Sequence, residues 1–178
     1  MLEQNILVVV DYQNDFVTGA LKVAGAALIE NAVAKRIADA YGRGDRVIFL
    51  KDTHPKSYLK TLEGQNLPVE HCIAETEGHK LYGKIAALES KCGSITIEKL
   101  QFGTTDIPAR LKALQVVPRE FALIGVAAEI CVISNALILK TQFRETPVKI
   151  YADACAGMTK AAVEAALLVA KSCHIIVE

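Results

Sequence analysis

An aspartate, a lysine and a cysteine each follow a separate apolar run of the sequence. Asp11 comes directly after Ile6–Val10. Lys99 ends a short alternating segment, and Cys131 lies just beyond Phe121–Val126. A thiolate is a nucleophile, and the pKa of a cysteine falls beside a lysine or at a helix N-terminus. A nearby carboxylate can accept the thiol proton and return it to a leaving group. Together these residue types predict nucleophilic catalysis by Cys131.

Each of the three residues also has an ordinary structural explanation. A buried cysteine such as Cys131 usually acts as a small hydrophobic residue. Asp11 could cap the turn after its strand, and Lys99 could be solvated. The catalytic hypothesis therefore depends on all three reaching the same place. We expect structural roles for the other cysteines, which are Cys72, Cys92, Cys155 and Cys173.

Two histidines and another aspartate form a second group. Asp52 and His54 stand two residues apart after the apolar run Val47–Leu50, and His71 lies on the far side of a long loop. Two imidazoles and a carboxylate suit a divalent transition metal (Zn²⁺, Fe²⁺ or Mn²⁺) with waters in the open positions. Alternatively, the histidines of this loop could simply be exposed. We expect surface or packing roles for the remaining histidines, His79 and His174.

Strands and helices alternate along the chain. Continuous β-branched runs predict strands that are covered on both faces, and apolar residues three or four apart predict helices. The predicted strands are Ile6–Val10, Val47–Leu50, Ile95–Ile97, Phe121–Val126, Val148–Tyr151 and Ile175–Val177. The predicted helices cover residues 29–40, 107–114, 130–141 and 159–170, with Thr105 and Thr159 as caps of the second and fourth. Thr53–Thr76 is predicted to be a long irregular loop, a kind of segment that is often functional.

This alternation predicts the fold. Successive βαβ crossovers are right-handed and give a mainly parallel sheet with helices on both faces. We therefore expect a three-layer α/β fold, Rossmann-like, with six strands. Ligands of such open sheets bind beyond the carboxyl ends of the strands. Asp11, Lys99 and Cys131 would then meet at one edge, with Asp52 close by.

Length and composition narrow the classes of function. The 178 residues fit one domain, residues 1–178, at roughly 150 residues per domain. Lys+Arg and Asp+Glu balance at 20 each, so the charge expected of a nucleic-acid binder is absent. No apolar run approaches the roughly 18 residues of a membrane span, and the first residues do not read as a signal peptide. Five cysteines without a CxxC pair indicate reduced thiols. We expect a cytoplasmic protein with a small-molecule partner, bound to neither nucleic acid nor membrane.

Five short segments, in order along the chain, carry a family resemblance. They are VVVDYQNDF (Val8–Phe16), KDTH (Lys51–His54), LPVEHCIAETEG (Leu67–Gly78), EKLQFGTT (Glu98–Thr105) and GVAAEICVISNA (Gly125–Ala136). With them the chain resembles the isochorismatase-like cysteine hydrolases, the superfamily of nicotinamidases and isochorismatases. The resemblance implies that Asp11, Lys99 and Cys131 form a catalytic triad. It also implies a cis peptide bond between Val126 and Ala127, with the backbone amides of Ala127 and Cys131 as an oxyanion hole.

The resemblance also bears on the metal and the substrate. Nicotinamidases hold a metal through an Asp-x-His pair and a later His, which here are Asp52, His54 and His71; isochorismatases lack this set. Nicotinamidases commonly place a Trp near the position of Leu67, but this chain contains no Trp. The expected walls of the substrate pocket are therefore Phe16, Leu67 and Tyr58. Before Cys131 the chain reads Ala-Ala-Glu, where many relatives have Ala-Thr-Asp or Cys-Thr-Asp.

These features together predict a hydrolase that cleaves a small carboxamide through a thioester. Nicotinamide, cleaved to nicotinate and ammonia, is the first candidate, and Zn²⁺ is the first candidate metal. Within the same superfamily the alternatives are another amide, a carbamoyl compound or an enol ether. An alternative of a different class is a non-catalytic α/β binding protein. The resemblance further implies assembly into a homodimer or homotetramer.

Overall fold

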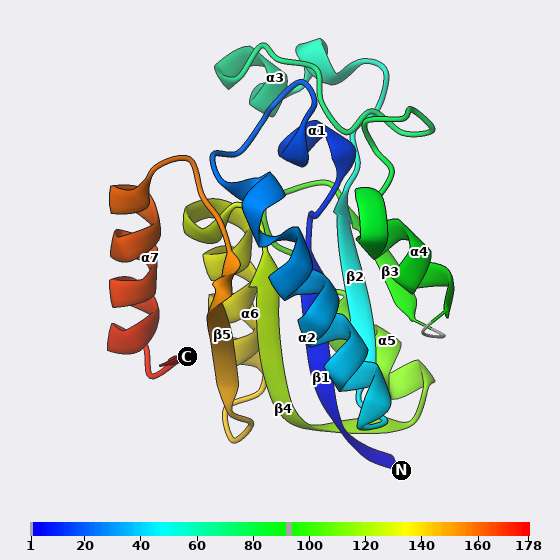
Figure 1. Cartoon of the computed structure of the whole chain (residues 1–178), viewed down its shortest axis with the longest axis vertical. Helices are drawn as coiled ribbons and strands as arrows, with labels where there is room; N and C mark the ends of the chain where they lie inside the picture. The colour runs from blue at the N-terminus through cyan, green and yellow to red at the C-terminus, as the bar shows by residue number, and fades with distance from the viewer. Residues whose placement is uncertain (1, 92–93) are drawn as a thin grey trace.

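The computed structural model describes residues 2–91 and 94–178. Six strands form a single sheet in the order β3-β2-β1-β4-β5-β6, and every neighbouring pair is parallel (Figure 1). The strands are β1 (Leu2–Val10), β2 (Arg46–Asp52), β3 (Ile95–Lys99), β4 (Val116–Gly125), β5 (Val148–Cys155) and β6 (Ile176–Val177). The predicted six-stranded parallel α/β fold is therefore confirmed.

Helices cover both faces of this sheet. The helices of the described chain are α1 (Asn14–Val17), α2 (Glu30–Gly42), α3 (Leu62–Asn66), α4 (Gly83–Lys91), α5 (Ile107–Ala113), α6 (Ile133–Gln142) and α7 (Lys160–Ser172). Shorter turns are η1 (Ala26–Ile29), η2 (Tyr58–Lys60) and the π-helical turn η3 (Ala128–Val132). Helices α2 and α4 pack on one face of the sheet, and α5, α6 and α7 pack on the other.

Residues Ile6–Val10 of strand β1 are all apolar because both faces of this part of the strand are buried. Ile6, Val8 and Val10 belong to the core on the α5–α7 side, whereas Leu7 and Val9 belong to the core on the α2 side. Because side chains alternate between the two faces of a strand, a strand buried on both faces needs apolar residues throughout. Burying each such side chain stabilises the fold by roughly 1.5–3 kcal/mol.

The helix starts agree only partly with the sequence-based expectations. Thr159 caps α7 as predicted, since its side chain accepts a hydrogen bond from the Ala162 N–H at 3.1 Å. The prediction for Thr105 is wrong, because α5 begins at Ile107 without a side-chain cap. Instead, the Thr104 hydroxyl accepts the Asp106 N–H at 3.2 Å, and this turn moves the helix start beyond the reach of Thr105.

Some elements are not predicted from the sequence at all. Helix α4 buries only Ile85 fully, so its sequence lacks a clear apolar stripe. The predicted loop Thr53–Thr76 contains the short elements η2 and α3. Cys72 and Cys155 are buried and Cys173 is exposed, all as free thiols, while Cys92 lies outside the described residues.

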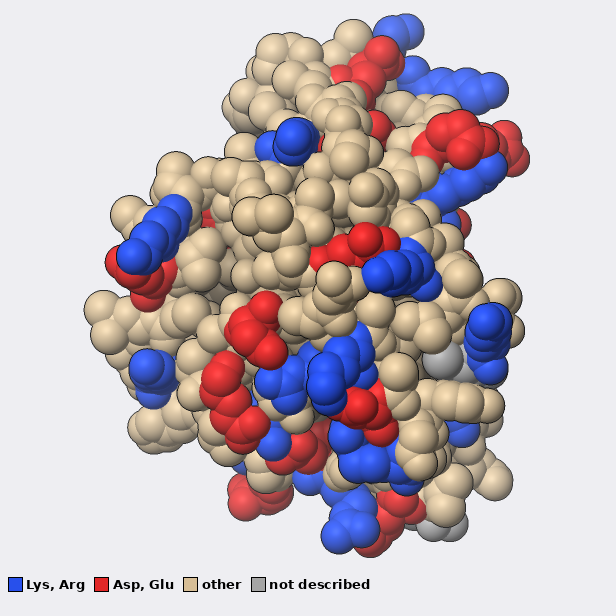
Figure 2. All heavy atoms as spheres, in the orientation of Figure 1, with Lys and Arg blue, Asp and Glu red and all other residues tan. Residues whose placement is uncertain are grey.

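Charged side chains of both signs are intermingled over the lower part of the face that α2 occupies (Figure 2). This distribution agrees with the balance of 20 basic and 20 acidic residues. Within residues 2–91 and 94–178, no helix is long and apolar enough to span a bilayer.

Candidate active site

The structure brings Asp11, Lys99 and Cys131 together at the carboxyl edge of the sheet. The Lys99 Nζ lies 2.8 Å from Asp11 Oδ2 and 3.8 Å from Cys131 Sγ. All three are buried, with exposed fractions of 3%, 0% and 7% for Lys99, Asp11 and Cys131. Lys99 stands opposite Asp52 in the pairing of β3 with β2, so its long side chain must cross β2 to reach Asp11 above β1. The ends of three separate strands therefore converge on one point.

The backbone around Cys131 is unusual. The Val126–Ala127 peptide bond is cis, as the resemblance implies, and Cys131 lies in the π-helical turn η3 directly beyond it. Gly125 has a φ of +120°, and a Cβ there would lie 2.1 Å from the Val10 carbonyl oxygen. Only glycine can therefore let β4 end this close to β1. The Ala128 N–H donates to the Ala156 carbonyl at 2.8 Å and fixes the turn to the end of β5.

Burial is the largest single influence on the pKa values of Asp11, Lys99 and Cys131. Burial raises the pKa of Asp11 to about 6, although the Lys99 charge opposes it. Burial and the Asp11 charge raise the pKa of the Cys131 thiol well above its usual range, and Lys99 offsets this only in part. Lys99 thus acts on the pKa of Cys131 in the expected direction, but the overall lowering expected from Lys99 and the turn is not found. Burial also acts against the Lys99 ammonium, but the charges of Asp11, Cys131 and Asp52 outweigh it and raise the pKa of Lys99.

These protonation states suit a proton transfer between the thiol and Asp11. Within the described residues, neither carboxylate oxygen of Asp11 accepts a well-directed hydrogen bond, although Lys99 forms a close ion pair with it. Asp11 therefore has lone pairs free to accept a proton. With a pKa of about 6 it is a competent base near neutral pH, because a general base works best when its pKa is near the working pH.

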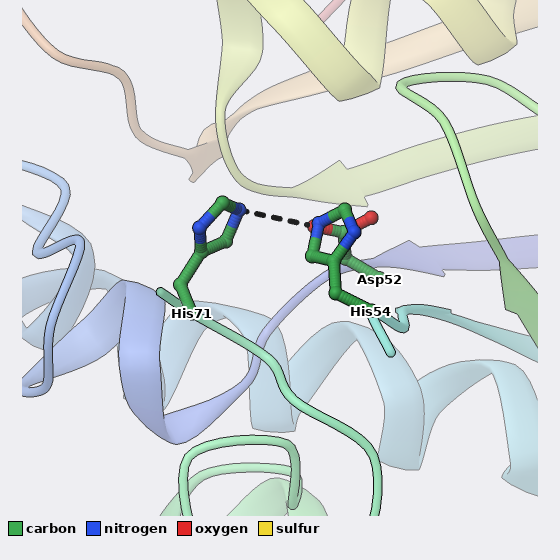
Figure 3. A group of neighbouring side chains, drawn as sticks. All are labelled: Asp52, His54 and His71. Carbon is green, nitrogen blue, oxygen red and sulfur yellow. Dashed lines mark hydrogen bonds and ion pairs between the residues drawn. The ribbon is translucent and has the colours of Figure 1, made fainter. Parts of the chain in front are cut away.

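Asp52, His54 and His71 form a second buried cluster next to the first (Figure 3). The Asp52 Oδ2 lies 2.9 Å from His54 Nε2 and 3.5 Å from His71 Nε2. One ligand atom from each residue lies within 4.8 Å of the others. The two clusters meet where the Lys99 Nζ lies 3.3 Å from Asp52 Oδ1. The structure therefore brings together the residues that the sequence offers as metal ligands.

Asp52 carries the negative charge of this cluster. Burial raises the pKa of Asp52, but hydrogen bonds from His54 and His71 and the Lys99 charge outweigh it and hold that pKa well below its usual range. Burial acts to lower the pKa of His71, but contacts with Asp52 and the Val69 carbonyl raise it overall. The His71 Nδ1 lies 2.8 Å from that carbonyl, which leaves Nε2 to face Asp52. A carboxylate and two imidazole nitrogens are a donor set that divalent transition metals prefer.

Glu63 is a further acidic neighbour that we do not predict from the sequence. Its Oε1 lies 3.8 Å from His54 Nε2, and its side chain is mostly buried. Glu63 belongs to α3, within the long segment after β2, and its position depends on how that segment folds back over the sheet. No periodicity of the sequence points to it.

A small, mostly apolar cavity of about 190 Å³ lies beside the two clusters. Cys131 and Ala127 line one part of it, and Asp52 and His71 line another. The rest of its wall is Phe16, Leu21, Val23, Glu63, Leu67, Phe102, Ile130 and Met158. For scale, an apolar cavity of about 150 Å³ can hold benzene. The cavity can therefore hold one six-membered ring with its reacting group close to Cys131.

Phe16 and Leu67 line this cavity, as expected for walls of a pocket, but Tyr58 does not. The Tyr58 ring is fully buried, with its centroid 4.7 Å from that of His54 and 5.1 Å from that of His71. Its hydroxyl donates to the Leu67 carbonyl at 2.9 Å. Tyr58 therefore packs against the two imidazoles and does not line the cavity, because η2 turns its side chain toward the core.

The remaining two histidines lie outside both clusters. His79 is buried, and its Nε2 lies 2.8 Å from the Thr53 hydroxyl. His174 is exposed at the end of α7.

Comparisons with known proteins identify the family of this chain. Residues 5–177 match the model of the isochorismatase domain. The chain belongs to the isochorismatase family. This assignment places it among the isochorismatase-family hydrolases and confirms the resemblance seen in its motifs. A search of curated protein sequences found no match for the chain.

Solved structures of other isochorismatase-family proteins resemble this chain over its whole length. A nicotinamidase/pyrazinamidase from Bacillus subtilis is 28% identical, with a TM-score of 0.86 and 99% of both chains covered. A pyrazinamidase from Pyrococcus horikoshii, solved in complex with zinc, is 26% identical, with a TM-score of 0.81 and 98% of both chains covered. A pyrazinamidase/nicotinamidase from Streptococcus mutans shares the fold at 24% identity, with a TM-score of 0.87 over 98% of this chain and 100% of that one.

Proposed function

We propose that this isochorismatase-family hydrolase cleaves a small, neutral carboxamide through a thioester on Cys131, with nicotinamide as the first substrate. The observation that carries the proposal is the convergence of Asp11, Lys99 and Cys131 beside an apolar cavity of about 190 Å³. The similarity to a nicotinamidase/pyrazinamidase and to a pyrazinamidase supports an amide as the substrate. We propose that residues 1–178 act as one hydrolase domain.

In the acylation step, the Cys131 sulfur attacks the carbonyl carbon of the amide while Asp11 takes the thiol proton. The Lys99 ammonium, 3.8 Å from the sulfur, stabilises the developing thiolate. Backbone N–H groups of Ala127 and Cys131 donate to the carbonyl oxygen as it becomes an oxyanion, an interaction worth about 3 kcal/mol for a single donor. Asp11 then returns the proton to the nitrogen as the C–N bond breaks. Ammonia leaves, and the acyl group remains on Cys131.

In the deacylation step, a water molecule attacks the thioester. Asp11, again a carboxylate, accepts one proton from this water. The C–S bond breaks, and that proton returns to the Cys131 sulfur. The products are a carboxylic acid and the original thiol, so each turnover consumes one amide and one water and leaves the enzyme unchanged.

Asp52, His54 and His71 would hold a divalent metal beside the cavity, with Zn²⁺ as the first candidate and Fe²⁺ or Mn²⁺ as alternatives. The donor set fits such an ion, because it combines a carboxylate of strongly lowered pKa with two imidazoles, and Glu63 adds a nearby negative charge. When bound, the metal would act as a Lewis acid that can coordinate a ring nitrogen of the substrate. The protein itself orients the ring, since Phe16 and Leu67 lie on the cavity wall.

The lining of the cavity favours a neutral substrate. No lysine or arginine is among its lining residues in the described chain, and the only charged ones are Asp52 and Glu63. The side chains of the wall therefore offer a substrate carboxylate no lysine or arginine in exchange for its lost hydration. On these side chains alone, an uncharged amide is favoured over an amide that bears a carboxylate.

Ammonia release from a panel of small amides tests the proposal. The panel contains nicotinamide, pyrazinamide, benzamide and a carboxylate-bearing amide of similar size. We expect release from the ring carboxamides and little from the charged one. Turnover of the charged amide alone, or of none of the panel, would contradict the proposed substrate class.

We also propose that the enzyme is cytoplasmic and assembles as a homodimer or homotetramer. Light scattering on the purified protein measures its mass directly. A mass equal to that of one 19.2 kDa chain at all concentrations would contradict the proposed assembly.

A further inference from the structure

The side chain of Gln13 holds the backbone of Asp52 at both of its polar groups. Its Oε1 accepts the Asp52 N–H at 2.8 Å, and its Nε2 donates to the Asp52 carbonyl at 2.9 Å. The same Nε2 donates to the His79 carbonyl at 2.9 Å. Gln13 is fully buried yet does not line the cavity. Its amide therefore fixes the backbone position of Asp52 at the end of β2.

Two residues further on, the Asp15 side chain holds the loop that carries His71. Its Oδ2 accepts the N–H of Cys72 at 2.8 Å, directly after His71, and its Oδ1 accepts the Ala20 N–H at 3.2 Å. Cys72 has a φ of +46°, a conformation that non-glycine residues rarely adopt without a specific contact.

Two glycines make room for the Asp15 carboxylate. A Cβ at Gly78 would lie 2.0 Å from its Oδ2, and a Cβ at Gly19 would lie 2.5 Å from its Oδ1. The pocket around Asp15 is therefore built for this side chain, and its bond to the loop is not an incidental surface contact.

The third residue of the cluster is tied to the same loop. The His54 N–H donates to the Cys72 carbonyl at 2.9 Å, and the Ala74 N–H donates to the His54 carbonyl at 2.9 Å. Gln13 holds Asp52, Asp15 holds the residue after His71, and His54 pairs with that loop. The backbones of all three residues are thus connected to the segment 13–15.

We propose that Gln13 and Asp15 are positioning residues that hold Asp52, His54 and His71 in their ligand arrangement before a metal arrives. The inference rests on the metal site in the proposed function. Asp11 lies two residues before this segment and Phe16 directly after it, so residues 11–16 position the proposed base, part of the cavity wall and the metal cluster relative to one another.

The test measures metal binding directly. Co²⁺ affinity is obtained by competition with a chromophoric chelator, and the visible absorption spectrum of bound Co²⁺ reports the geometry of its ligands. The variants are Gln13→Met, which keeps the size of the side chain and removes its hydrogen bonds, and Asp15→Asn, which keeps the shape and removes the charge. Asn14→Ala is the matched control, because Asn14 lies between them and its Nδ2 donates to the Glu77 carbonyl at 2.7 Å, away from the three ligands.

We expect Gln13→Met and Asp15→Asn to bind Co²⁺ roughly 10- to 100-fold more weakly than wild type, with altered spectra, the range seen when groups that orient metal ligands are removed. Asn14→Ala should stay close to wild type in both readouts. If Gln13→Met does not fold, Asp15→Asn decides alone. Wild-type affinity and spectrum in the folded variants, or an equal loss in Asn14→Ala, would overturn the positioning role. Failure of the wild-type protein itself to bind Co²⁺ would instead overturn the metal site of the proposed function.

Discussion

At the scale of single residues, the proposed chemistry depends on the pairing of Asp11 with Cys131. Both groups are buried, and burial raises both pKa values. In the proposed mechanism the thiol therefore starts protonated, and its proton moves during the attack. Asp11, with a pKa of about 6, is the group beside it that can take this proton. In the proposed mechanism, the nucleophile is activated by a neighbouring base and not by a lowered pKa of its own.

The pH dependence of kcat/KM follows from the raised pKa of Asp11. The reaction needs Asp11 as a carboxylate, so we expect kcat/KM to be highest near neutral pH and to fall about tenfold per unit below pH 6. Initial rates of ammonia release in buffers of constant ionic strength measure this profile. A profile that stays flat well below pH 6 would contradict the role of Asp11 as the base.

The three catalytic candidates could be predicted from the sequence because each follows the end of a strand. Strand ends are visible as apolar runs, and parallel strands bring their carboxyl ends to one edge. The pKa of Cys131 could not be predicted, because the depth of burial depends on what α6 and the loops cover. Tyr58 is predicted to line the cavity, but the turn η2, which the sequence does not show, directs its ring into the core.

At the scale of elements, the join between β4 and the turn η3 positions the nucleophile. Gly125 lies against the Val10 carbonyl at a φ that other residues rarely adopt, and Cys131 follows within six residues. The strands are predicted well because their runs are continuous. Helix α4 and the residues Glu63, Phe102 and Met158 are not predicted from the sequence, because short helices and loops lack a regular apolar pattern.

Gly125→Ala tests this join. The added Cβ would lie 2.1 Å from the Val10 oxygen, and the backbone conformation alone costs about 1–3 kcal/mol for a residue with a Cβ. We expect the free energy of unfolding to fall by at least that amount, together with a loss of activity, in urea denaturation and ammonia assays. Gly42→Ala is the control, because a Cβ at Gly42 meets nothing within 4 Å. Equal stability of the two variants would show that the close approach is unimportant.

At the scale of the whole molecule, the strand order brings two chemical clusters to one cavity. Strand β1 lies between β2 and β4, so Asp11 stands between the Asp52 cluster and Cys131. Lys99 spans both, 2.8 Å from Asp11 and 3.3 Å from Asp52. Sequence reasoning could place each group at the same edge of the sheet. The contact between the groups, and the cavity that they share, required the three-dimensional arrangement.

Removal of the metal tests whether the two clusters act together. After dialysis against a chelator, we expect kcat/KM for nicotinamide to fall by roughly 100-fold or more, because a Lewis-acid contact is worth several kcal/mol. Adding Zn²⁺ should restore activity to the wild-type protein but not to Asp52→Ala. Full activity after the metal content has been shown to be negligible would contradict a role for Asp52, His54 and His71 in the reaction.

Ammonia release from nicotinamide by Cys131→Ala, compared with Cys155→Ala, tests the central claim most directly. Both substitutions remove a buried thiol at the carboxyl edge of the sheet, but only Cys131 lines the cavity. We predict that Cys131→Ala remains folded and loses at least about 10⁴-fold in kcat, as expected when a nucleophile is removed, while Cys155→Ala keeps most of its activity. Comparable turnover by the two variants would contradict covalent catalysis by Cys131.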